Sequence, residues 1–184
     1  MSQTNELEIM ERIALDLERV EESLASSFNT GVEDFNALIR PLSAAGGKRL
    51  RAQLCLLIAN AGTSIERQRV KIAEAVEMLH LATLIHDDVL DQAEIRRGED
   101  TIHMHKGNKV AILSGDYLFA KAFKIVSEMT NMKYLQVFSH IITCLVEGEF
   151  MQMEDVYRID QGIERYMTKT QKKTADFMEG CMEL

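Results

Sequence analysis

Three aspartates form the cluster in this sequence that is best suited to chemistry. Asp87, Asp88 and Asp91 lie in the segment His-Asp-Asp-Val-Leu-Asp. Residues four apart in a helix project from one face, so the carboxylates of Asp87 and Asp91 would lie about one turn apart. Hard oxygen ligands suit Mg²⁺, which binds one or two carboxylates and completes its coordination with water and phosphate oxygens. The spacing predicts a magnesium site, and a solvated acidic helix end is the alternative with the same pattern.

The place of this acidic cluster in its helix favours the functional interpretation. A helix is expected from Ile65 to about Asp91, and its second half is apolar nearly all round. The aspartates lie at its C-terminal end, where the helix dipole disfavours negative charge and neighbouring carboxylates repel each other. Such a local conflict with stability indicates a site that is kept for function.

Two groups of cations could bind anions. The segment Gly46–Arg51 has the sequence Gly-Gly-Lys-Arg-Leu-Arg, a glycine turn that leads into a helix start with backbone N–H groups. Arg96 and Arg97 follow Asp91 closely, and paired guanidinium groups suit bidentate binding of phosphate. Both groups predict phosphate sites, although a basic helix start and a loop of surface charges are the ordinary alternatives.

One histidine is aligned with the acidic cluster. His80 lies seven residues before Asp87, which places it on nearly the same helix face, about 10 Å back along the axis. A single histidine in an apolar helix is usually a hydrogen-bonded core residue. The shared face favours a role for His80 in the site instead.

Composition narrows the class of protein. Hydrophobic residues make up 46% of the chain and charged residues 27%, as in folded globular proteins. With one proline, no tryptophan and 6% aromatic residues, helices are favoured over sheets. The net charge of −8 argues against nonspecific binding of nucleic acid or anionic lipid.

Location can also be predicted from the sequence. The chain's cysteines (Cys55, Cys144 and Cys181) lie far apart in apolar segments, as expected for reduced core thiols. The first residues lack the order of a signal peptide, and no apolar run approaches the roughly 18–20 residues of a membrane span. We therefore expect a cytoplasmic protein without a membrane span.

The elements that must position these residues are helices. Apolar periodicity, glycines and the proline predict an irregular stretch over 92–107 between two sets of helices. The expected helices span 6–28, 32–41, 49–61, 65–91, 108–129, 133–157 and 161–184. Short connections between them predict an all-α antiparallel helical bundle that forms one domain over residues 1–184.

The order of these features resembles the trans-isoprenyl (polyprenyl) diphosphate synthase family. The similarity runs from about Gly46 to the end of the chain. Besides the acidic cluster and the basic segment it includes Glu-Met-Leu-His (77–80), Arg-Arg-Gly (96–98), Ala-Ile-Leu-Ser-Gly-Asp-Tyr-Leu (111–118), Glu-Gly-Glu (147–149), Gln152 and Lys-Thr-Ala (173–175). The resemblance implies a helical bundle of the isoprenoid synthase type.

The resemblance implies an enzyme that condenses isopentenyl diphosphate with an allylic prenyl diphosphate, with Mg²⁺ as cofactor. It places the metal on Asp87 and Asp91, with Asp88 in support. The residues implied at the allylic diphosphate are Arg96, Gln152, Lys173 and Thr174, of which Lys173 is also counted as catalytic with the aspartates. Those implied at the diphosphate of isopentenyl diphosphate are Lys48, Arg51, His80 and Arg97.

The resemblance also bears on product length. Bulky aromatic residues four or five positions before the first aspartate shorten the product in this family. Here those positions are Thr83 and Ala82, and no aromatic residue occurs between Arg67 and Asp91. We expect a pocket that runs past Leu79 and Val76, and a hexaprenyl to octaprenyl product like those of medium- and long-chain synthases.

The chain lacks one feature of the family, a second aspartate-rich motif beyond the Lys-Thr segment. The expected bundle is therefore truncated on its C-terminal side. Three accounts stay open: a fragment of a full synthase, one half of a split enzyme, and a noncatalytic or half-site subunit that binds prenyl diphosphates. The resemblance implies a homodimer or heterodimer. A terpene cyclase-like bundle and a helical scaffold without ligand are further alternatives, and the basic segment with His80 argues against the cyclase.

Overall fold

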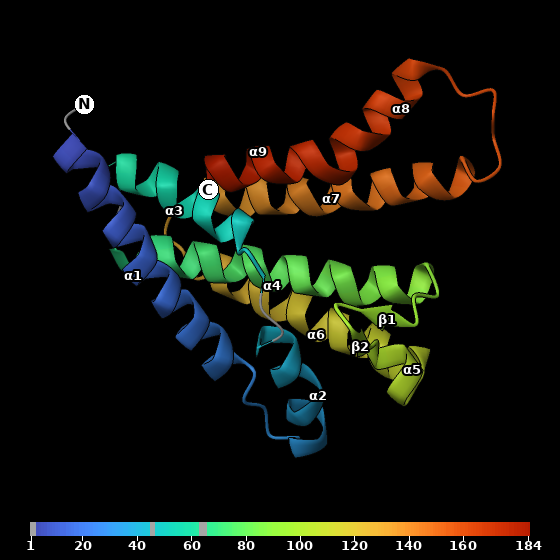
Figure 1. The fold of residues 1–184 in the computed structure, drawn as a ribbon, viewed down its shortest axis with the longest axis horizontal. Coiled ribbons are helices and arrows are strands. Elements are labelled where there is room, and N and C mark those ends of the chain that lie inside the picture. Colours follow the sequence, from blue (N-terminus) through green and yellow to red (C-terminus); the bar gives the residue numbers. More distant parts are fainter. Residues whose placement is uncertain (1–2, 45–46, 63–65) are drawn as a thin grey trace. The chain divides into compact units, whose positions relative to one another are not determined.

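A computed structural model describes residues 3–44, 47–62 and 66–184. The chain divides into two compact units, Met1–Glu128 and Met129–Leu184. Within the described residues both units are helical apart from one short hairpin (Figure 1). The all-α prediction is confirmed, and the single domain over 1–184 stays a prediction.

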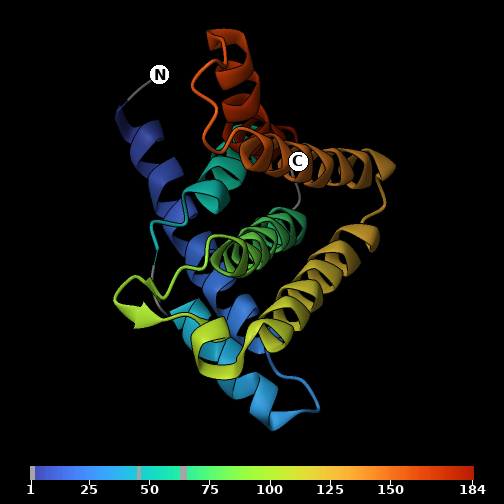
Figure 2. The ribbon, with the colours of Figure 1, turned by 90° about the vertical axis from the view of Figure 1, so that its right-hand side faces the viewer.

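Unit 1 is built around one long central helix, α4. In Figure 2 the ribbon of α4 lies between α1 and α6, and it also contacts α3 and α5. The elements of this unit are α1 (Gln3–Ser27), α2 (Glu33–Ala44), α3 (Leu50–Ala61), α4 (Glu66–Leu90), β1 (Ile95–Arg96), β2 (Glu99–Asp100), α5 (Ile102–Lys106) and α6 (Asn108–Ser127).

The composition of α4 explains its central position. Its apolar residues occur on all sides of the helix, and Ala73, Val76, Met78, Leu79 and Ala82 are fully buried. A helix that is apolar all round has to be covered on every face, so it lies in the middle of a bundle. Even so, in the parts of the chain that the structure describes, no helix has the length and apolarity that crossing a bilayer requires.

A buried carboxylate joins α4 to α1. Glu74 on α4 has no exposed surface. It accepts hydrogen bonds from the hydroxyl groups of Ser23 at 2.7 Å and Ser27 at 2.6 Å, and from the ammonium group of Lys71 at 2.6 Å. These partners offset the cost of burying the charge, so Glu74 fixes how the two helices pack.

The stretch after α4 is more regular than the sequence predicted. Strands β1 and β2 pair antiparallel and are joined by Arg97 and Gly98, whose φ angles are 55° and 86°. Two consecutive residues with positive φ make the tight hairpin turn whose twist matches that of paired strands. The irregular loop expected over 92–107 is thus an ordered hairpin followed by α5.

Helix boundaries can be compared with the predictions in two places. The helix expected to end near Pro41 and the Gly46-Gly47 pair is α2, which contains the proline and ends at Ala44. The single helix expected over 161–184 consists of α8 (Ile163–Thr170), the π-helical turn η1 (Gln171–Ala175) and α9 (Asp176–Glu183). These elements form unit 2 with α7 (Met132–Glu154), whose start is capped by the Asn131 side chain.

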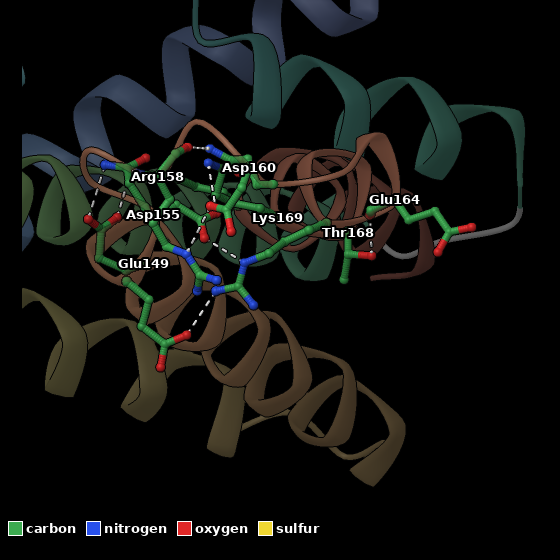
Figure 3. A network of polar contacts seen from close by, with 12 residues as sticks. Glu149, Asp155, Arg158, Asp160, Glu164, Thr168 and Lys169 are labelled. Atoms are coloured by element: carbon green, nitrogen blue, oxygen red, sulfur yellow. Dashed lines mark hydrogen bonds and ion pairs between the residues drawn. The ribbon is translucent and has the colours of Figure 1, made fainter.

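Unit 2 contains a network of ion pairs where α7 ends and α8 begins (Figure 3). Asp155 accepts from Arg165 Nε at 2.5 Å and from Lys169 Nζ at 3.2 Å, and Arg165 also donates to Glu154. Desolvation alone would raise the pKa of Asp155, but the hydrogen bonds from Arg165 and Lys169 lower it. This network orients α8, and through it η1, against α7.

Candidate functional site

The C-terminal end of α4 presents the aspartate cluster in two different environments. Asp87 is half-buried and Asp91 exposed, and the Asp91 N–H donates to the Asp87 carbonyl at 2.8 Å, which continues the helical turn. Asp88 is 7% exposed and accepts from Arg96 Nε at 2.6 Å. Asp87 and Asp91 therefore lie one turn apart at the more exposed side of this helix end, and Asp88 orients an arginine.

The donor set at this helix end can be compared with what Mg²⁺ requires. In the described parts of the chain, no group of three or more His, Cys, Asp or Glu side chains is arranged to hold a metal. A pair of carboxylates alone fits a cation that also binds phosphate oxygens and water, as Mg²⁺ does in phosphate-transfer sites. Asp87 and Asp91 fit Mg²⁺ in that form.

A histidine next to the cluster ties this end of α4 to α6. The ring of His86 stacks on Phe119 at 5.5 Å between centroids, and its Nε2 lies 3.1 Å from the Ile112 carbonyl oxygen. A side chain at Gly115 would collide with this ring, since a Cβ there would lie 2.2 Å from Nε2. His86 was not predicted as a site residue, although it begins the acidic segment and Gly115 lies in one of the family-like segments.

His80 and the predicted arginines come together in unit 1. Arg51 Nη1 lies 3.2 Å from His80 Nε2, and the Arg97 guanidinium lies so close to Gly47 that a Cβ there would be 3.2 Å from both Nη atoms. Burial first, and then the charges of Arg51 and Arg97, lower the pKa of His80 to about 3. Because arginine only donates, the neutral ring accepts at Nε2 and carries its proton on Nδ1.

The segment before α3 only partly matches the anion site predicted from it. Gly46 lies outside the described residues, and Lys48 is exposed. The first turn of α3 is already engaged, because the Ala52 N–H donates to the buried carboxylate of Glu77 at 3.1 Å. An internal carboxylate thus binds the N–H group of Ala52, directly after the predicted anion site, and the anion site over Gly46–Arg51 stays a prediction.

Arg49, in the middle of that segment, is buried. It donates from Nε to Glu21 at 2.5 Å and lies 3.5 Å from Glu77, and its φ of 44° is unusual for a residue with a side chain. Burial alone would lower the pKa of Arg49, but the hydrogen bonds and charges of Glu21 and Glu77 raise it. Arg49 thus anchors the segment, while its neighbour Lys48 is exposed and Arg51 contacts His80.

Unit 2 brings together two of its predicted site residues. Lys173 lies in η1, where its Nζ is 2.6 Å from Glu149 and donates to Gln152 Oε1 at 2.9 Å. Thr174 follows on the same turn and is exposed. A Cβ on Gly148 would lie 3.0 Å from the Lys173 nitrogen, so this glycine lets η1 approach α7 closely. Single π-helical turns occur often at functional sites.

The residues predicted to set product length do not line a cavity found in unit 1. This cavity of about 520 Å³ lies between α2, the hairpin with α5, and the α4 side chains Leu81, Leu84 and Ile85. Ala82 is fully buried, and the Thr83 hydroxyl donates to the His80 carbonyl at 2.8 Å. Leu79 and Val76, past which the pocket was expected to run, are also fully buried.

Known proteins that are similar in sequence to this chain belong to one family. The polyprenyl synthetase family model matches residues 32–184. Heptaprenyl diphosphate synthase component 2 of Geobacillus stearothermophilus is 38% identical over 170 residues, which cover 92% of this chain and 53% of that protein. The chain spans about half the length of the curated relatives it matches.

Solved structures show the same fold. Heptaprenyl diphosphate synthase from Staphylococcus aureus superposes with a TM-score of 0.89 at 28% identity, covering 93% of this chain and 54% of that one. A polyprenyl synthase from Caulobacter crescentus CB15, complexed with calcium and isoprenyl diphosphate, has a TM-score of 0.88 at 33% identity, with coverage of 94% and 54%. The predicted bundle of the isoprenoid synthase type is confirmed, over about half of such a fold. This chain is a member of the polyprenyl synthetase family.

Proposed function

We propose that this chain is a prenyltransferase that condenses isopentenyl diphosphate with an allylic prenyl diphosphate in a Mg²⁺-dependent reaction. The observation that carries the proposal is the arrangement along α4. Neutral His80, bonded to Arg51 and close to Arg97, lies on the helix face that also presents Asp87 and Asp91. Along this face of α4, the arginines that surround His80 could bind one diphosphate, and the carboxylate pair could bind a second, metal-bound one.

The acidic end of α4 would bind the allylic substrate. Asp87 and Asp91 would hold Mg²⁺, which when bound stabilises the negative charge of the departing diphosphate. Asp88 holds Arg96 through Nε, so that its Nη groups can donate to the same diphosphate. The sequence resemblance also assigns Lys173, Gln152 and Thr174 to the allylic diphosphate, and this assignment stays a prediction.

The arginines next to His80, together with Lys48, would bind isopentenyl diphosphate. Arg51 and Arg97 can each donate two parallel hydrogen bonds to a diphosphate, and Lys48 adds a point charge. His80 stays neutral next to these cations, so it adds no further positive charge and retains an N–H donor at Nδ1.

The reaction requires that charge develop only where the protein can stabilise it. The allylic C–O bond breaks and diphosphate leaves with the bonding electrons. The double bond of isopentenyl diphosphate attacks the resulting allylic cation to form the new C–C bond, and a proton is then lost to restore a double bond. Arginines fixed in advance around the diphosphates lower the barrier without reorganising during the reaction.

A medium- or long-chain product, hexaprenyl to octaprenyl, is part of the proposal. Ala82 and Thr83 are small, and α4 has no aromatic residue before its aspartates. Two of the matched proteins are named heptaprenyl diphosphate synthases, which supports the same range.

A second candidate is a half-site that needs another chain or a second copy to complete it. It is favoured by one finding, that the chain spans about half the length of its relatives. The name "component 2" of one relative also fits an enzyme with more than one kind of chain. Under this proposal the chain binds prenyl diphosphates and turns them over only in a homodimer or heterodimer.

Incorporation of radiolabelled isopentenyl diphosphate, with farnesyl diphosphate and Mg²⁺, distinguishes the two candidates. The variant Asp87→Ala removes the proposed metal ligand, and Glu128→Gln, a side chain 66% exposed at the end of α6, is the control for a lost charge. Incorporation that only Asp87→Ala abolishes supports catalysis, and the product length then tests the chain-length proposal. Binding of farnesyl diphosphate without incorporation supports the half-site, and the absence of both contradicts the proposed function.

A further inference from the structure

We propose that Glu77 is a positioning residue for the isopentenyl diphosphate site, an inference that rests on the proposed function. Its buried carboxylate fixes the start of α3 on α4, and so places Arg51 beside His80. Glu77 would touch no substrate itself and would act through Arg49 and the backbone of α3.

The contacts of Glu77 explain how one side chain can do this. It is 2% exposed, and its two carboxylate oxygens have different partners. Oε1 accepts from the Ala52 N–H at 3.1 Å, which satisfies a donor in the first turn of α3. Oε2 lies 3.5 Å from Arg49 Nη1. A negative charge at a helix N-terminus is favourable for the helix dipole, so the carboxylate stabilises both the turn and the arginine.

Arg49 connects this carboxylate to the residues that would bind substrate. Its guanidinium is buried between Glu77 and Glu21, and it lies between Lys48 and Arg51 in the sequence. Its φ of 44° is a conformation that a residue with a side chain adopts at a cost, unless its surroundings hold it there. The two carboxylates provide that hold, and the direction of the chain on both sides of Arg49 depends on it.

The position of Glu77 on α4 completes the link. Glu77 and His80 are three residues apart, so they lie on neighbouring parts of one helix face. The segment that Glu77 fixes is the one from which Arg51 reaches His80 Nε2 at 3.2 Å. Without the anchor, the start of α3 could shift relative to α4, and the arginine and histidine would no longer be held together.

Glu74 offers a matched comparison one turn earlier on the same helix. Like Glu77 it is a buried glutamate that bonds to partners on another helix, but those partners are Ser23 and Ser27 of α1. The substitutions Glu77→Gln and Glu74→Gln remove the same charge from the same helix. Only the first weakens the contact with Arg49, so a difference between them isolates positioning from general loss of packing.

The test is calorimetric titration of isopentenyl diphosphate into the wild-type chain and both variants, with thermal unfolding recorded for each. We expect Glu77→Gln to raise the Kd about tenfold, as when a charge-assisted hydrogen bond no longer holds a binding segment. Glu74→Gln should change the Kd less than about twofold. Mg²⁺-dependent binding of farnesyl diphosphate should be unchanged in Glu77→Gln, because the acidic end of α4 is a separate site.

Each other outcome overturns the inference. An unchanged Kd in Glu77→Gln, or equal losses in both variants, would mean that Glu77 is only structural. If Glu77→Gln bound both isopentenyl diphosphate and farnesyl diphosphate more weakly, Glu77 would likewise have only a structural role. If the wild-type chain bound neither diphosphate, the proposed function would fail together with the inference. Should Glu77→Gln not fold, Glu21→Gln weakens the hold on Arg49 from its more exposed side and is expected to raise the same Kd.

Discussion

Replacing Gly115 by alanine tests how α6 holds the acidic end of α4. The added Cβ would lie 2.2 Å from Nε2 and 2.4 Å from Cδ2 of the His86 ring. The ring cannot simply turn away, since it stacks on Phe119 and its Nε2 lies 3.1 Å from the Ile112 carbonyl oxygen. Either α4 and α6 move apart or the ring loses these contacts.

The sign of the change in the free energy of unfolding shows whether the added methyl group of Gly115→Ala meets the His86 ring. Glycine to alanine inside a helix ordinarily stabilises a protein by about 0.5–1 kcal/mol, because alanine loses less backbone entropy on folding. Overpacking a close contact costs about 1–3 kcal/mol. For Gly115→Ala we therefore expect the free energy of unfolding to fall by about 1–2 kcal/mol, opposite to the helix-propensity effect.

The free energy of unfolding can be measured by urea denaturation of the single variants and of the double variant that combines Gly115→Ala with His86→Ala. Gly31→Ala is the control, because a Cβ at Gly31 would meet nothing within 4 Å. In a His86→Ala background the ring is gone, so Gly115→Ala should no longer destabilise and should show the ordinary stabilising effect. The reasoning is refuted if Gly115→Ala stabilises the wild-type chain, or if its cost stays the same when His86 is absent.

Two further predictions concern the α4 face. Burial and the neighbouring arginines lower the pKa of His80 from 6.5 to about 3, so its contribution to stability is complete above pH 6.5 and is lost as the pH falls toward 3. Between pH 7 and pH 5 the free energy of unfolding should therefore fall by about 2 kcal/mol, and this fall should be absent in His80→Asn. An NMR titration of His80 with a midpoint near pH 6.5 would contradict the prediction. Asp88→Asn weakens the contact with Arg96, so stability should fall by about 1 kcal/mol and amide exchange in the β1–β2 hairpin should accelerate. Unchanged exchange would show that this ion pair does not hold the hairpin.

The long helices could be predicted from sequence because their cause is local. The apolar pattern of α4 and the glycine that ends α3 determine those elements over neighbouring residues. The alignment of His80 with Asp87 follows from helical geometry alone, and the structure confirms the helix that carries both. The spacing of these residues in the sequence was therefore enough to propose them as site residues.

The features that the sequence did not predict depend on contacts distant in the chain. The turn at Arg97 and Gly98 lacks the Asn-Gly signal of tight hairpins, and Asp88 holds β1 from another element. The π-helical turn at Lys173 is accompanied by contacts to Glu149 and Gln152 on α7. No local pattern indicates such contacts.

The anchoring role of Arg49 could not be predicted from the sequence either, because it depends on residues distant in the chain. In the sequence it is one of several cations after two glycines, and each could equally bind a ligand. Only the fold brings Glu21 and Glu77 to its guanidinium, and so separates the arginine that anchors the segment from Arg51, which faces His80.

Binding of farnesyl diphosphate, measured by titration with and without Mg²⁺, tests the central claim most directly. The Asp87–Asp91 pair requires both the metal and the diphosphate to form a complete site. Wild-type chain should bind only when Mg²⁺ is present, and Asp87→Asn and Asp91→Asn should each weaken binding at least about tenfold, while Glu128→Gln should not. Binding that is equally strong without Mg²⁺, or that survives loss of either aspartate, would contradict the claim that the end of α4 is a metal-dependent diphosphate site.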